Sequence, residues 1–168
     1  MERRGILRLP FFRQKTEYTC GPATLEMVFK FFGLKLKEKS IARIAKTNER
    51  DGTNHSGLIN TARKEGFYCF VHEYAHLSDI QRFLEEGLPV IVHYTEPESE
   101  IGHYAVVVGL SKWEVILNDP WDGRGFRIGK TEFVERWTKV STDYHAHGWL
   151  MVLSRKKFSI GREYAPKE

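Results

Sequence analysis

The most continuous apolar pattern in the chain lies between Pro22 and Gly33. Apolar residues there occupy almost every side of a helical cylinder, and only Thr24, Glu26 and Lys30 interrupt them. A helix that is apolar nearly all round belongs at the centre of a domain. Glu26 and Lys30 are four residues apart, so we expect an ion pair on the one polar stripe. Gly33 tolerates a positive φ and is expected to end the helix.

The pattern over the rest of the chain predicts further helices and several strands. Helices are expected from Ser78 onward and over residues 38–46, 55–66 and 131–140. Ser78 and Gln81 form a capping-box pattern, and Thr53 or Asn54 would cap the helix that follows them. Strands are expected over residues 6–9, 67–74, 88–95, 103–110, 114–117, 126–128 and 149–153. Because most helices precede most strands, the pattern favours an α+β fold, with N-terminal helices packed against an antiparallel sheet.

Composition and charge narrow the class of protein. The 168 residues suit one domain, and 26 Lys and Arg against 22 Asp and Glu leave a net charge of +4. The basic residues are densest at the two ends, which is more typical of solvated termini than of a nucleic-acid surface, so no nucleic-acid partner is expected. Two cysteines are too few for a secreted disulfide scaffold. Neither a signal peptide nor a membrane-spanning run is visible, which predicts a soluble, cytoplasmic protein.

Cys20 stands at the expected start of the central helix. A thiol in the first turn is exposed to the positive end of the helix dipole and to free N–H groups, and both favour the nucleophilic thiolate. Gly21 leaves room for a substrate backbone, and the amide of Gln14, a short loop upstream, could donate to an oxyanion. The alternative is that Cys20 is an inert buried thiol, as most buried cysteines are. Candidate partners elsewhere in the chain favour the catalytic interpretation.

A nucleophilic thiol needs a base, and the base needs a group that orients it. His103 begins an apolar strand just after Gly102, and Asp119 ends the next strand before Pro120. The start of one antiparallel strand and the end of the next lie at the same end of a sheet, so these two side chains can meet there. Asn118 should point to the opposite face. Taken singly, a core histidine and an ordinary Asp-Pro turn would explain both residues.

Three motifs carry a resemblance to a known family. They are CGPA at residues 20–23, preceded by Gln14, then GHYAVVVG at 102–109 and NDP at 118–120. In this order they resemble the papain-fold cysteine peptidases that cut double-glycine leader peptides. Those peptidases usually form the N-terminal domain of bacteriocin-exporting ABC transporters, and stand-alone relatives exist. The resemblance extends from about residue 14 to residue 153 of a single domain, 1–168. This chain differs in that no membrane span and no ATPase follow.

The resemblance implies a papain-like α+β fold and a role for four residues. Cys20 would be the nucleophile, His103 the general base and acid, Asp119 the residue that orients His103, and Gln14 the oxyanion donor. It implies a peptide or protein substrate, with a separately encoded transporter as a candidate partner, and no cofactor or metal. A non-hydrolytic peptide-binding module and an acyltransferase on the same fold remain alternatives. The presence of all four residues argues against a module without turnover.

Other groupings have simpler explanations. Cys69, His72 and His76 have a tempting spacing for a metal, but residues 69 and 72 of a strand point to opposite faces. Asp143, His145 and His147 are expected in a polar surface loop. The four tryptophans are expected in the core or at its rim, although Trp121, just after Asp119, could line a cleft.

Overall fold

The structure is a computed structural model that describes residues 5–139, 147–159 and 163–167. The helices are α1 (Cys20–Phe31), α2 (Glu38–Ile44), α3 (His55–Lys64), α4 (Leu77–Glu85) and α5 (Lys130–Thr138). The strands are β1 (Tyr68–His72), β2 (Val90–Thr95), β3 (Gly102–Leu110), β4 (Glu114–Asp119), β5 (Gly123–Gly129), β6 (Leu150–Ser154) and β7 (Glu163–Tyr164). The expected helices and strands are therefore present with small shifts in their bounds, except for residues 6–9. Asp143 and His145 lie outside the described residues.

In the described parts of the chain the strands form one sheet of seven, in the order β5-β4-β3-β2-β6-β1-β7. Every neighbouring pair is antiparallel. Strands β2, β3 and β4 are consecutive both in the chain and in the sheet, whereas β6 enters between β2 and β1. This arrangement of N-terminal helices and an antiparallel sheet confirms the α+β prediction.

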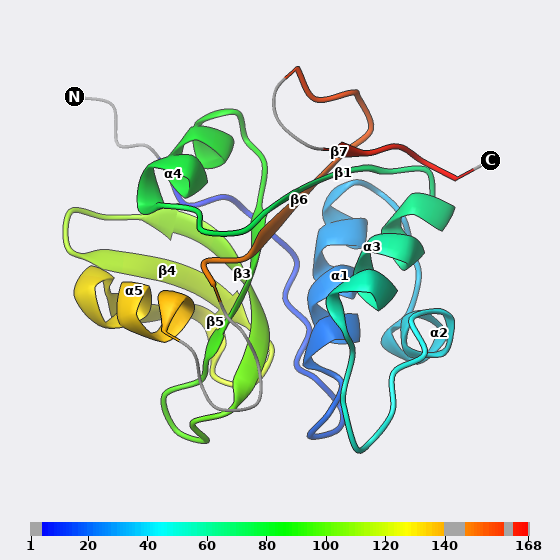
Figure 1. Cartoon of the computed structure of the whole chain (residues 1–168), viewed down its shortest axis with the longest axis horizontal. Helices are drawn as coiled ribbons and strands as arrows, with labels where there is room; N and C mark the ends of the chain where they lie inside the picture. Colours follow the sequence, from blue (N-terminus) through cyan, green and yellow to red (C-terminus); the bar gives the residue numbers. More distant parts are fainter. Residues whose placement is uncertain (1–4, 140–146, 160–162, 168) are drawn as a thin grey trace.

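Helices cover both faces of the sheet (Figure 1), with α1, α2 and α3 on one side and α4 and α5 on the other. The alternation of side chains along a strand explains why both faces are apolar. In β3, Tyr104, Val106 and Val108 pack into the cluster that contains α1, while Ala105 and Val107 pack into the opposite cluster with α5. The sheet is thus a shared wall between two hydrophobic cores.

Helix α1 is the central helix that its apolar pattern predicts. Every residue from Gly21 to Phe29 is buried, and Gly33 ends the segment with φ +85°. The expected Glu26–Lys30 ion pair is wrong. The Glu26 carboxylate instead accepts a hydrogen bond from the backbone N–H of Glu38 at 3.1 Å and lies 3.9 Å from the Lys37 ammonium. The chain after α1 folds back over Glu26 and buries it.

Two local predictions are also wrong. Residues 6–9 do not form a strand, and this segment runs beside β3 with a hydrogen bond from the Leu7 N–H to the Val108 carbonyl. Pro10, which has no N–H, cannot extend such a ladder. Helix α4 begins at Leu77, not at Ser78, and its capping carboxylate is that of Asp79, which accepts from the His76 N–H at 2.7 Å. The cap of α3 is Asn54, one of the two expected residues.

Among the described residues, no helix combines the length and the apolar character needed to cross a membrane.

A glycine in the first turn of α3, packed against the end of α2, gives a test of this packing. A Cβ atom on Gly57 would lie 2.5 Å from the carbonyl oxygen of Ala45, which is backbone and cannot move aside cheaply. We expect Gly57→Ala to reduce the free energy of unfolding by about 1–3 kcal/mol, as overpacking does. Gly129→Ala is the matched control, because no described atom lies within 4 Å of its Cβ position. Equal denaturation midpoints for the two variants would contradict this account of the packing.

Candidate active site

Cys20 is the first residue of α1 and is half-buried at the junction between the helices and the sheet. Burial alone would raise the pKa of its thiol. A hydrogen bond to His103, the charge of His103 and a hydrogen bond from the backbone N–H of Tyr104 outweigh burial, so the pKa of Cys20 lies below the ordinary value. These contacts favour a thiolate, which is the nucleophilic form.

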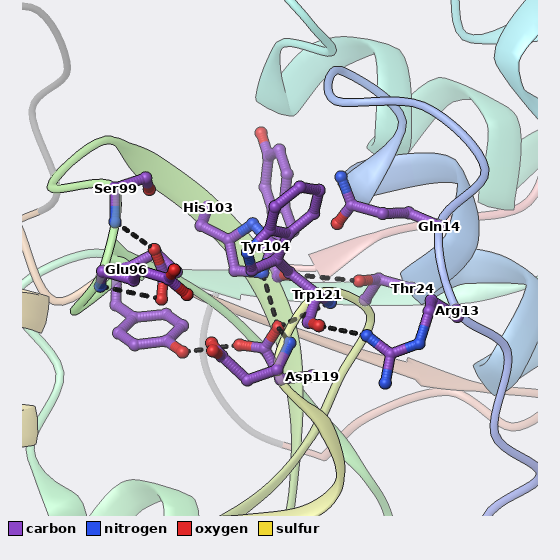
Figure 2. Close-up of polar contacts among 12 residues, drawn as sticks. Arg13, Gln14, Thr24, Glu96, Ser99, His103, Tyr104, Asp119 and Trp121 are labelled. Atoms are coloured by element: carbon purple, nitrogen blue, oxygen red, sulfur yellow. Dashed lines mark hydrogen bonds and ion pairs between the residues drawn. The ribbon is translucent and has the colours of Figure 1, made fainter.

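His103 and Asp119 meet at one end of the sheet, as the sequence predicts. The Nε2 atom of His103 lies 2.7 Å from Oδ1 of Asp119 (Figure 2), and both side chains are buried. His103 is the second residue of β3 and Asp119 is the last residue of β4. Because Nε2 is hydrogen-bonded to the carboxylate, Nδ1 is the ring nitrogen that is available to the thiol.

The electrostatics of this pair favour an imidazolium. Burial would lower the pKa of His103, but the hydrogen bond to Asp119 and the hydrogen bond and charge of Cys20 raise it to about 10. Burial would raise the pKa of Asp119, but the hydrogen bond and charge of His103 lower it overall. A thiolate and an imidazolium therefore stabilise each other, with Asp119 as the anion behind them.

Asn118 points to the opposite face of the sheet, as expected from strand alternation. Its Nδ2 donates to the Leu9 carbonyl at 3.3 Å, and its Oδ1 accepts from the Gly125 N–H at 3.2 Å. The residue next to Asp119 thus supports the N-terminal segment and the β4–β5 turn, on the face of the sheet away from Asp119.

Gln14 lies in the loop before α1, and its buried side chain extends toward the His103 side of the site (Figure 2). One N–H of its amide donates to the Thr16 carbonyl at 2.8 Å. Its backbone N–H donates to the Pro120 carbonyl at 3.0 Å. Its amide oxygen Oε1 is buried and has no hydrogen-bond partner among the described residues, and the role of the amide as an oxyanion donor stays a prediction.

The loop before α1 is also bound to the turn after Asp119. Besides the Gln14 contact, the Arg13 guanidinium donates to the carbonyl of Trp121 (Figure 2). The side that carries Gln14 and Cys20 is therefore held against the side that carries His103 and Asp119. Trp121 is 41% exposed beside this junction, and its place in the lining of a cleft stays a prediction.

Tyr94 is a site residue that the sequence analysis missed. Its hydroxyl donates to Oδ2 of Asp119 at 2.5 Å, while Oδ1 also accepts from the backbone N–H groups of Trp121 and Asp122 at 2.9 and 3.0 Å. Tyr94 stands in an apolar run that indicates only a core strand. Tyr94 can be recognised as a site residue only from its position in β2 directly opposite His103, and that position is known only once the strand register is known.

The acidic loop between β2 and β3 is well structured. The buried carboxylate of Glu96 accepts from the N–H groups of Glu98 and Ser99 at 2.9 and 2.5 Å (Figure 2). Burial and the charges of Asp119 and Glu96 raise the pKa of Asp122 to about 7. Within the described residues, the acidic groups close enough to share a cation are Glu96, Glu98 and Asp122. The Glu96 carboxylate already accepts hydrogen bonds from backbone N–H groups.

The remaining sequence candidates lie away from the site. The thiol of Cys69 is fully buried, 4.0 Å from the Ile59 carbonyl, and burial raises its pKa to about 12. Trp137 and Trp149 are core residues, whereas Trp113 is 72% exposed.

The family model of the peptidase C39 family matches residues 8–142 of the chain. The transport/processing ATP-binding protein ComA of Streptococcus pneumoniae is 32% identical over 143 residues, which are 80% of this chain and 19% of that transporter. An uncharacterised protein of Methanothermobacter marburgensis is 32% identical over 126 residues, which are 75% of this chain and 81% of that protein. The chain thus spans a small part of the transporter and most of the length of the archaeal relative.

The fold matches that of a solved relative as well. The peptidase domain of Streptococcus ComA, a bi-functional ABC transporter involved in a quorum-sensing pathway, aligns with a TM-score of 0.69 at 27% identity. The alignment covers 89% of this chain and 99% of that domain. The papain-like fold expected from the sequence is thereby confirmed.

The two thiols give a direct test of the site's electrostatics. The pKa of Cys20 is lowered and that of Cys69 is raised to about 12, so iodoacetamide should alkylate Cys20 well below pH 9, where an ordinary thiol is mostly protonated. Cys69 should stay unmodified in the folded protein and react only after unfolding. Peptide mass spectrometry over a pH series measures both rates, and equal rates in the native protein would contradict the assignment.

Proposed function

The chain belongs to the peptidase C39 family, and on that premise we propose that it is a cysteine peptidase with Cys20 as its nucleophile. One observation carries the proposal. The Cys20 thiol contacts His103, and the far nitrogen of His103 lies 2.7 Å from the buried carboxylate of Asp119. A thiol, a base and an orienting group in contact are what covalent catalysis of acyl transfer requires.

The geometry supports a two-step hydrolysis. The Cys20 thiolate attacks the scissile carbonyl carbon, and the negative oxygen that forms accepts from the Gln14 amide and from a backbone N–H near Cys20. The His103 imidazolium gives its proton to the leaving amine as the C–N bond breaks, which leaves a thioester on Cys20. His103 then takes a proton from water, the hydroxide attacks the thioester, the C–S bond breaks, and the acid product leaves with the thiolate–imidazolium pair restored.

The proposed substrate is a leader-type peptide cut after a double glycine. This follows the resemblance of the motifs around Cys20, His103 and Asp119, and the naming of ComA as a transport and processing protein. A separately encoded transporter is the proposed partner, and the catalytic core is proposed to span about residues 14–153.

Two alternatives on the same fold remain distinguishable. Acyl transfer would use the same thioester but an amine in place of water, so the mass of the product separates it from hydrolysis. A peptide-binding module without turnover is disfavoured, because Gln14, Cys20, His103 and Asp119 are gathered at one junction.

We expect Cys20→Ala to reduce turnover by more than about 10³-fold, because the reaction then has no nucleophile. A fluorogenic peptide with a double-glycine junction, compared with the same peptide carrying two alanines there, provides the assay. Cys69→Ala is the control. It should keep wild-type turnover, since Cys69 lies in the core and is not one of the proposed site residues. Substantial cleavage by folded Cys20→Ala would refute the nucleophile assignment, with folding checked by thermal melting.

Replacing Gln14 and replacing Asp119 should change the rates of acylation and of Cys20 alkylation in different ways. Gln14→Ala should slow acylation about 10²-fold yet leave Cys20 alkylation at the wild-type rate, since an oxyanion donor acts only when charge develops on the carbonyl. Asp119→Asn keeps a hydrogen bond to His103 without the charge, and a loss of about 10- to 100-fold in kcat/KM is expected. Asp119→Ala should cost more and should also slow alkylation. Wild-type rates of both reactions in Asp119→Ala would reduce Asp119 to a turn residue.

A further inference from the structure

The two oxygens of the Asp119 carboxylate accept different numbers of hydrogen bonds. Oδ1 accepts from His103 and from two backbone N–H groups, whereas the hydrogen bond found for Oδ2 among the described residues comes from the Tyr94 hydroxyl at 2.5 Å. Asp119 is 0% exposed, so water is not at hand to replace a missing donor. A buried carboxylate oxygen without a donor is costly.

Tyr94 is a residue of the sheet and lies beside His103 and Asp119. It is fully buried in β2, directly opposite His103 in the β2–β3 ladder, and its ring packs 5.8 Å from that of Phe133 on α5. Burial, followed by the charge of Asp119, raises the pKa of Tyr94. The hydroxyl therefore keeps its proton and remains a donor.

The charged groups around Asp119 make this donor more important. Asp122, which follows in the turn, and Glu96, at the end of β2, are both acidic and both act on the same buried region. His103 from β3 is the one titratable group among the described residues that is bonded to Asp119 and can carry a positive charge. Tyr94 thus offsets part of the repulsion that two neighbouring carboxyl groups exert on the Asp119 charge.

We propose that Tyr94 is a positioning residue for the proposed peptidase reaction, whose hydroxyl keeps the Asp119 carboxylate ionised and turned toward His103. Its hydroxyl is bonded to Asp119, and through Asp119 it acts on the thiolate–imidazolium pair. The proposal rests on the proposed function for its effect on turnover. Its effect on the Cys20 thiol can be measured without any substrate.

The sign of the effect follows from hydrogen bonding to the charged form. The Tyr94 bond is one of the contacts that lower the pKa of Asp119. Without it, Asp119 takes up a proton at a higher pH, and a neutral Asp119 no longer stabilises the His103 imidazolium. The charge of Asp119 by itself slightly raises the pKa of Cys20, but the hydrogen bond and charge of His103 lower that pKa more strongly. When the imidazolium is weakened, the thiolate at Cys20 is therefore lost at a higher pH as the solution is acidified.

Tyr94→Phe removes the hydroxyl and keeps the ring, and Thr61→Val is the matched control. Thr61 is equally buried and its hydroxyl donates to the Gly57 carbonyl at 2.7 Å within α3, away from the site. The experiment records the rate of Cys20 alkylation by iodoacetamide against pH in the wild type and both variants, with thermal melting of each. If Tyr94→Phe does not fold, Tyr94→Met takes its place, because a flexible side chain can refill the space.

We expect the acid limb of the alkylation profile to move up by about half to one pH unit in Tyr94→Phe and to stay in place in Thr61→Val. In the peptide assay, kcat should fall about 10-fold at the acid limb, with KM unchanged. A Tyr94→Phe profile that coincides with the wild type, or an equal shift in Thr61→Val, would overturn the proposal. If the wild type cleaves no peptide, the proposed function fails, and the alkylation profiles still decide the role of Tyr94.

Discussion

The ionised carboxylate of Asp119, buried completely at one end of the sheet, is the constraint that organises this site. A buried charge is tolerated only where hydrogen bonds and an opposite charge surround it. Asp119 receives these from β3 through His103, from β2 through Tyr94 and from the turn that follows it. The meander of β2, β3 and β4 is therefore held in register partly by the group that orients His103, so the fold and the proposed chemistry share one requirement.

The second requirement is that the helical layer packs against the sheet so that Cys20 contacts His103. Cys20 comes from the helical layer and His103 from the sheet, and a thiolate–imidazolium pair needs them in contact. The hydroxyl of Thr24 on α1 donates to the carbonyl of Tyr104 at 3.3 Å, one residue beyond His103 (Figure 2). The backbone bond from Gln14 to Pro120 closes the other side of the junction. Short contacts on both sides of the thiol thus fix its distance from the imidazole.

Much of this arrangement follows from local patterns in the sequence. An apolar run on every side of a helix predicts a central α1, and strand alternation separates Asn118 from Asp119. The start of β3 and the end of β4 bring His103 and Asp119 together because the two strands are consecutive. These inferences need only the period of a helix or strand and the pairing of neighbouring strands.

The features that the sequence does not reveal depend on contacts between segments that no local pattern specifies. Glu26 loses its expected partner Lys30 because the chain folds back and offers it Lys37 and a backbone N–H. Tyr94 looks like any core aromatic until its register opposite His103 is known. The insertion of β6 between β2 and β1 joins strands that are far apart in the chain, and no periodicity predicts such a pairing.

The division of the site between two layers also bears on the newly made chain. The strands that hold Tyr94, His103 and Asp119 pair with their neighbours in sequence, whereas α1 must close a long loop to reach β3, and long-range contacts form slowly. Before α1 docks, Cys20 lacks both His103 and the Tyr104 N–H, so its thiol has the pKa of an ordinary cysteine. The proposed peptidase activity would therefore arise only once α1 has docked against the sheet, so it depends on the folded state of the whole domain.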